Sequence, residues 1–233
     1  MQEKEPICIK FETQPNQDYC TVSCIRMLLK AHGLNTSYGK LNTILHTVKG
    51  LGTPPRFTPS HYGNTKVVRD QSIADRLLMS DLELTKRGIF VKTEVLPSNW
   101  EKLILSYLDE EIYPIAHLEI APDPYDSKIN FGCSDFRSSE PIGHDVIVTH
   151  LNQNDRTVNF LDPLCQVRDG MSTKQCYGVY NPGPTSISYQ TFERYIEANG
   201  GYITSIYRPE LKGKGITLYG FEQSGIKEKR RVK

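Results

Sequence analysis

The chain changes character near Tyr113, and this change constrains its fold more than any other feature of the sequence. Before this point, apolar residues recur at helical spacing, most clearly from Val22 to Ala31, and Gly33 then favours a helix end. After it, runs rich in β-branched residues predict strands at 115–120, around His144, around Val158 and at 202–207, with one helix at 189–198. Helices followed by strands predict an α+β fold, in which a helical part packs against an antiparallel sheet.

Three further helices are predicted in the first half of the chain. Ser37 is a candidate cap for a second helix through Leu45, and apolar residues from Ile73 to Leu82 have the spacing of a third. The sequence Ser98-Asn99-Trp100-Glu101 matches a capping box that opens a fourth helix.

A cysteine occupies the first turn of the 22–31 helix. Cys20 lies where the positive end of the helix dipole favours a thiolate, which is the reactive form of a thiol. Asn16 or Asp18 is the candidate N-cap of this helix. Cys20 is therefore a candidate nucleophile, and the alternative is a buried cysteine that only fills the core.

A histidine and an aspartate are expected to meet on two strands that flank a polar turn at 152–155. The expected register pairs Val148 with Val158, Val146 with Phe160 and His144 with Asp162. Opposed residues on one face of a sheet are close enough for a carboxylate to orient an imidazole. In the alternative reading, His144 is a surface residue beside an Asp-Pro turn.

A glutamine completes this set of candidate site residues. Gln14 lies six positions before Cys20, and its side-chain N–H is a candidate oxyanion donor beside the Cys20 backbone N–H. A nucleophile, a base, an orienting carboxylate and an oxyanion donor are the parts that a cysteine hydrolase requires.

These residues resemble the papain-like cysteine peptidases of the C39 type, best known as bacteriocin-processing domains. The matching blocks, in the order found in that family, are Gln14, Cys20, Cys24 and Met27, then Gly143-His144, then Leu161-Asp162-Pro163. The resemblance implies Cys20 as nucleophile, His144 as base and acid, Asp162 as orienter and Gln14 as oxyanion donor. It also implies one two-lobed domain at 1–209, with a helical lobe at about 7–110, a sheet lobe at about 111–209, and a basic tail at 210–233.

The chain departs from that family in two places. Thr21 follows the nucleophile where the family has glycine, and we expect Thr21, Gly143 and Asp145 to contact the substrate. The stretch 49–70 is rich in proline and glycine and looks inserted. It is either a loop that binds or covers the substrate or a solvated surface excursion.

Composition places the chain among globular proteins. It has 233 residues, 38% of them hydrophobic and 24% charged, with no run long enough to span a membrane and no signal-peptide pattern at Met1–Glu5. We therefore expect a stand-alone cytoplasmic protein without an attached transporter. The net charge of +1 gives no support for nucleic acid as a partner, and the basic tail is either a docking signal or a solvated end.

The six cysteines raise the question of a metal site. Cys20 and Cys24 could form a zinc site with Cys165 and Cys176, but the spacings fit no common zinc motif. We expect neither a metal nor another cofactor, and we interpret Cys24 as core packing behind Cys20.

The sequence favours a cysteine hydrolase that cleaves a peptide or amide bond in a peptide or protein substrate. The same residues would serve a glutamine deamidase, or a transamidase in which an amine intercepts the thioester. An alternative of another class is a catalytically inactive papain-like fold that serves as a binding module. The sequence leaves the oligomeric state open.

Overall fold

The structure is a computed structural model that describes residues 9–12, 14–15, 17–47, 52–57, 71–120, 129–131, 134–136, 141–163 and 186–209. The helices of these ranges are α1 (Cys20–Ala31), α2 (Tyr38–Leu45), α3 (Ile73–Leu78), α4 (Trp100–Asp109) and α5 (Tyr189–Ala198), with short 3-10 turns at Gln17–Tyr19 and Thr85–Arg87. The strands are β1 (Arg56–Phe57), β2 (Gln71–Ser72), β3 (Phe90–Val95), β4 (Ile115–Ile120), β5 (Ile129–Phe131), β6 (Ser134–Phe136), β7 (Ile142–Asn152), β8 (Thr157–Leu161), β9 (Ser186–Ser188) and β10 (Tyr202–Tyr207). The basic tail, most of the stretch 49–70, and Cys165 and Cys176 lie outside the described residues.

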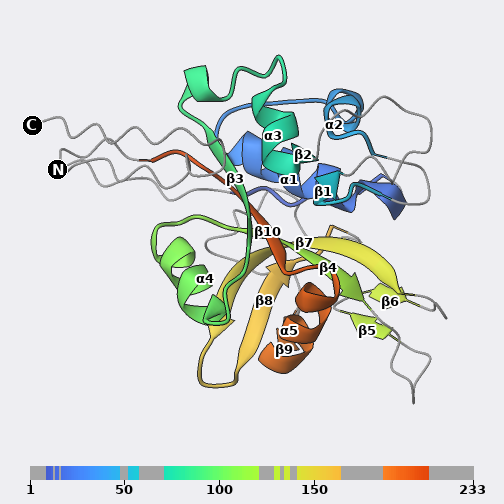
Figure 1. Ribbon diagram of the computed structural model, residues 1–233, viewed down its shortest axis with the longest axis vertical. Coiled ribbons are helices and arrows are strands. Elements are labelled where there is room, and N and C mark those ends of the chain that lie inside the picture. Colours follow the sequence, from blue (N-terminus) through green and yellow to red (C-terminus); the bar gives the residue numbers. More distant parts are fainter. Residues whose placement is uncertain are drawn as a thin grey trace, which may run out of the picture.

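A six-stranded antiparallel sheet organises the molecule. Its strand order is β3-β10-β4-β7-β8-β9, so β10 lies between two strands that precede it by many residues. Figure 1 shows α1, α2 and α3 on one side of the sheet, and α4 and α5 on the other. The predicted α+β class is confirmed. The strand β3, which falls within the 7–110 range expected to be helical, pairs along its whole length with β10 and forms an edge of the sheet.

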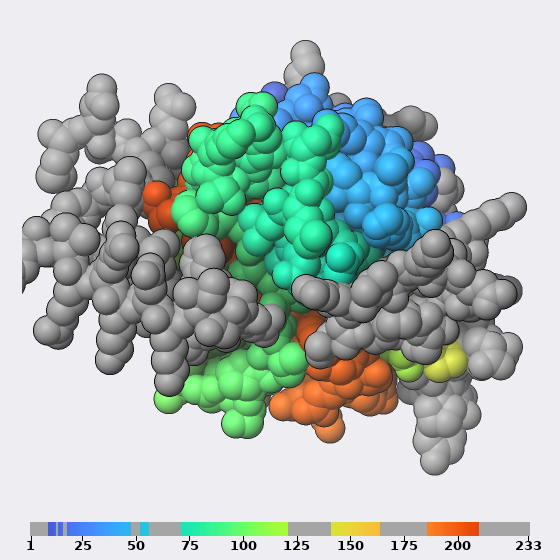
Figure 2. All heavy atoms as spheres, turned by 45° about the horizontal axis from the view of Figure 1, so that its top comes forward, coloured from blue at the N-terminus to red at the C-terminus, as the bar shows by residue number. Residues whose placement is uncertain are grey.

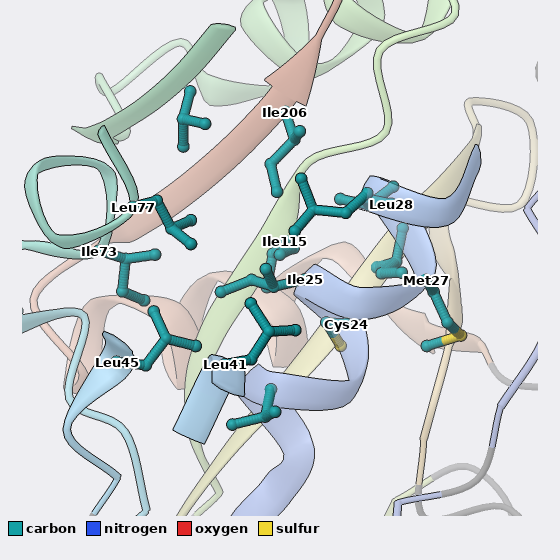
Figure 3. Packing of buried hydrophobic residues seen from close by; sticks show 14 of the residues in the cluster. Cys24, Ile25, Met27, Leu28, Leu41, Leu45, Ile73, Leu77, Ile115 and Ile206 are labelled. Atoms are coloured by element: carbon teal, nitrogen blue, oxygen red, sulfur yellow. The ribbon is translucent and has the colours of Figure 1, made fainter. Parts of the chain in front are cut away.

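The two faces of the sheet bury separate apolar clusters, because successive side chains of a strand point to opposite faces. Ile115 and Ile147 contact the cluster built by α1, α2 and α3, whereas Ala116 and Val146 contact the cluster built by α4 and α5. Figure 3 shows the first cluster, with α1 side chains between the sheet and helices α2 and α3. Figure 2 shows α2 in blue and α3 in teal side by side on the surface, with α4 in green and α5 in orange below them.

Most helix ends follow from local sequence. Ser37 caps α2 by accepting a hydrogen bond from the Lys40 N–H at 3.2 Å, as predicted. Gly33 has a φ of 81°, the left-handed conformation that glycine adopts readily after a helix. The third helix ends at Leu78, earlier than predicted, and Leu82 is buried in the turn that follows it.

The predicted capping box of the fourth helix is wrong. The N-cap of α4 is Asn99, whose side chain makes no capping bond within the described part of the chain. Packing positions this helix instead, because the Trp100 ring lies 5.2 Å from the Tyr189 ring and 5.1 Å from the Phe192 ring. A capping box does occur at α3, where Ser72 and Asp75 bond reciprocally.

Candidate active site

Cys20 is the first residue of α1 and follows directly on the 3-10 turn Gln17–Tyr19. The predicted N-cap is wrong, because Tyr19 is the N-cap and its side chain makes no capping hydrogen bond. Asp18 lies inside the 3-10 turn, and Asn16 falls outside the described residues. Cys20 is 6% exposed, so only a small part of the residue reaches the surface.

His144 lies on β7 and binds Asp162, the residue that follows β8. The His144 Nε2 atom lies 2.8 Å from the Asp162 Oδ1 atom, and the two residues are 2% and 1% exposed. The expected register of these strands is wrong by two residues on the His144 side of a bulge after Val148, where Ile147 pairs with Leu161, and by three on the turn side, where Leu151 pairs with Val158. A slip of two residues keeps each side chain on its face, so His144 still reaches Asp162, now across a diagonal.

Asp162 and Cys20 both act on the pKa of the His144 ring. Burial lowers the pKa of His144, but the interactions with Asp162, and after them those with Cys20, outweigh burial and raise the pKa to about 10. His144 is therefore protonated at neutral pH.

Gln14 lies on a segment held between α1 and the end of β8. Its backbone N–H donates to the Pro163 carbonyl oxygen at 2.8 Å, directly after Asp162. Two residues earlier, the Glu12 carboxylate pairs with Arg26 and Lys30 of α1. These contacts bring the three sequence blocks that contain Gln14, Cys20 and Asp162 together at one place.

The three residues expected to contact the substrate lie in different environments. Gly143 is exposed, and a Cβ at this position would meet no described atom within 4 Å, so the strand end beside His144 is open. Thr21 and Asp145 are 1% and 4% exposed, and the Thr21 hydroxyl donates to the Asp145 carboxylate. Their side chains are therefore neighbours of the site in the interior, where a substrate would not reach them.

Cys24 is a second thiol on the same helix, and its surroundings differ from those of Cys20. Figure 3 shows Cys24 among the apolar side chains of the core, and the residue is fully buried. Burial raises its pKa well above the usual value for cysteine, and the nearby Asp145 adds to this rise. Cys24 is thus a poor nucleophile.

His117 lies beside the site, although no motif of the sequence pointed to it. It is fully buried, and its Nδ1 atom lies 3.0 Å from Asp145 Oδ1. This contact depends on the register of two strands, because His117 on β4 lies directly opposite Asp145 on β7, next to His144.

Within the described ranges, no group of three His, Cys, Asp or Glu side chains could hold a metal ion. None of the helices in these ranges combines the length and the apolar character that a membrane crossing requires. A pocket of about 300 Å³ lies between α4, α5 and the turn after β7, and its lining residues carry no thiol or imidazole.

No family model and no curated protein matches the sequence. Among solved structures, the chain is similar to a protein from Bacillus anthracis assigned as a C39-like peptidase, with 13% identity and a TM-score of 0.50 over 89% of this chain and 100% of that one. It is also similar to the peptidase domain of Streptococcus ComA, a bifunctional ABC transporter involved in quorum sensing, with 16% identity and a TM-score of 0.46 over 86% of this chain and 99% of that one. The likeness to the Bacillus anthracis structure shows the fold: the chain has the papain-like α+β fold of a C39-like peptidase.

Proposed function

We propose that this chain is a cysteine hydrolase that cleaves a peptide or amide bond, with Cys20 as nucleophile, His144 as base and acid, and Asp162 as orienter. One observation carries the proposal: the buried His144 imidazole lies 2.8 Å from the Asp162 carboxylate, and the Cys20 thiol at the start of α1 adds to the rise of the His144 pKa. This is the arrangement that nucleophilic catalysis by cysteine requires.

In the proposed reaction, the Cys20 thiolate attacks the carbonyl carbon of the substrate and forms a tetrahedral intermediate. The Cys20 backbone N–H and the Gln14 side-chain amide stabilise its oxyanion. His144 gives its proton to the leaving amine as the C–N bond breaks, which leaves a thioester on Cys20. His144 then takes a proton from water, the resulting hydroxide attacks the thioester, and the thiolate departs as the acid is released.

The small exposure of Cys20 limits how a substrate approaches. Because Cys20 is 6% exposed and Gly143 opens onto free space, we expect an extended chain to pass over the exposed end of β7. A segment without a bulky side chain next to the scissile bond would fit most easily there. This expectation rests on access alone.

The first experiment measures the reactivity of Cys20. Iodoacetamide at neutral pH is expected to label Cys20 well before Cys24, because one thiol is activated by His144 and the other is buried with a raised pKa. His144→Ala should slow the labelling of Cys20 and leave that of Cys24 unchanged. Equal labelling of the two thiols in the intact protein would refute the proposal and leave the binding module as the better explanation.

The second experiment identifies the reaction. Profiling of protein termini with the wild type against Cys20→Ala is expected to reveal new termini that depend on Cys20. If no termini appear but a partner protein gains about 1 Da, the product is that of a deamidase, since this shift marks conversion of an amide to an acid by the same nucleophilic route.

A further inference from the structure

We propose that Thr21, Asp145 and His117 form a buried clamp that holds the nucleophile and the base in register, a role that rests on the proposed function. Thr21 directly follows Cys20, and Asp145 directly follows His144. A hydrogen bond between Thr21 and Asp145 therefore joins α1 to β7 at the residues next to the reacting pair. We call these three residues the clamp, and its members are positioning residues.

Polar contacts continue from the clamp into the sheet. Thr21 Oγ1 donates to Asp145 Oδ2, and His117 Nδ1 lies 3.0 Å from Asp145 Oδ1. His117 Nε2 lies 2.9 Å from Thr204 Oγ1, Thr204 Oγ1 lies 2.9 Å from Thr93 Oγ1, and the Ala74 N–H donates to Thr93 Oγ1.

The contact between His117 Nδ1 and Asp145 Oδ1 is a close polar contact at 3.0 Å rather than a hydrogen bond. Side chains from α1 and from β4 therefore meet the two oxygens of the Asp145 carboxylate, on the residue beside His144.

Stability alone does not account for this arrangement. The four side chains of Thr21, His117, Asp145 and Thr204 are between 0% and 4% exposed. Removing a carboxylate from water is costly, and well-packed apolar side chains of similar volume are usually at least as stabilising. A hydrogen bond fixes the relative position of two groups more narrowly than apolar packing does. The bond between the buried Asp145 carboxylate and Thr21 therefore fixes how the start of α1 lies against β7.

The clamp also accounts for the threonine after the nucleophile. A glycine at position 21 has no side chain to reach β7, whereas the Thr21 hydroxyl reaches Asp145 from the first turn of α1. One turn further along, the Cys24 thiol lies 3.5 Å from the Asp145 carbonyl oxygen. The helix thus meets this one residue of β7 at two points.

Three threonine variants test the proposal through the iodoacetamide alkylation rate of Cys20 at neutral pH. Thr21→Val keeps the shape of the side chain but removes the hydroxyl, and we expect alkylation to slow by about tenfold or more, as the loss of a hydrogen bond to a charged acceptor predicts. Thr21→Ser restores the hydroxyl and should restore the rate. Thr36→Val is the matched control, because it removes a buried hydroxyl from the segment between α1 and α2, away from the clamp and its polar contacts, and should leave the rate within about twofold of the wild type.

The outcomes separate the clamp from the proposed function. If wild-type Cys20 reacts no faster than Cys24, the proposed function fails and the clamp fails with it. If wild-type Cys20 is reactive but Thr21→Val is alkylated at the same rate, the clamp alone is overturned. Circular dichroism establishes that each variant is folded. Should Thr21→Val not fold, Thr21→Ala also removes the hydroxyl, and an unchanged rate in that variant overturns the clamp.

Discussion

Replacing Asp162 by asparagine removes a single negative charge from the candidate site and keeps its shape. The carboxylate lies 2.8 Å from His144 Nε2 at its nearest oxygen, and both residues are buried. The asparagine side-chain oxygen can still accept the His144 N–H. The substitution therefore tests the charge of Asp162 separately from its hydrogen bond.

The expected size of the effect follows from the geometry. Both charges are delocalised, so their centres are roughly 4 Å apart, and at an effective dielectric constant of about 20 their attraction is about 4 kcal/mol. One pKa unit corresponds to about 1.4 kcal/mol, so Asp162→Asn should lower the pKa of His144 by about 3 units. This matches the rise of the His144 pKa from its usual 6.5 to about 10, in which Asp162 is the largest favourable contribution.

The assay is an NMR pH titration of the protein with isotope-labelled histidine rings, with His144 assigned by the signal that is missing in His144→Gln. In the wild type, the ring should stay protonated to about pH 9, whereas in Asp162→Asn it should lose its proton near neutral pH. Asp81→Asn is the control, because it removes an exposed carboxylate that pairs with Lys40. A His144 ring that remains protonated to the same pH in Asp162→Asn would refute the reasoning, since Cys20 would then be sufficient to hold the proton.

Three other predictions concern stability and reactivity. In a Cys20→Ser background, the raised pKa of His144 should stabilise the fold in full below about pH 6.5, and this stabilisation should be lost as the pH rises through the folded-state pKa of His144. The free energy of unfolding in urea should therefore fall over this pH range. The fall should be absent when His144 is also changed to glutamine. Arg76→Met removes a buried guanidinium that donates to three main-chain carbonyls, and it should lower the free energy of unfolding by about 2 to 4 kcal/mol. Replacement of the exposed Arg87 by methionine should lower it by less than about 1 kcal/mol. Similar losses of stability in the two variants would contradict the role given to burial. Cys24→Ala should cost about 1 kcal/mol of stability and leave the alkylation rate of Cys20 within about twofold, and a tenfold change would show that Cys24 takes part in the site.

The helices and strands with strong local patterns could be predicted from the sequence. The strands 115–120 and 202–207 and the helix 189–198 have the expected bounds. Their apolar spacing coincides with their burial in the fold, so local pattern and tertiary packing favour the same structure. The strand β3 could not be predicted in this way, because its pairing with β10 is a contact between residues far apart in the chain.

One part of the candidate site, the pair of His144 and Asp162, could also be predicted from local pattern. The contact between His144 and Asp162 depends on which face each side chain occupies, and a register error of two residues leaves the faces unchanged. The interior position of Thr21 and Asp145 depends on how α1 lies across β7, which no local pattern encodes. For the same reason, no local pattern links His117 to these two residues.

The position of β10 in the sheet sets an order of events during synthesis. This strand inserts between β3 and β4, and its Thr204 is the partner of His117. A ribosome adds roughly 5 to 20 residues per second, so a nascent chain that already carries Cys20, His144 and Asp162 waits several seconds before residues 202–207 are made. Until then, β3 has no neighbour on either side in this sheet, and a hydrolase built this way would reach its working geometry only after nearly all of the described chain has been translated.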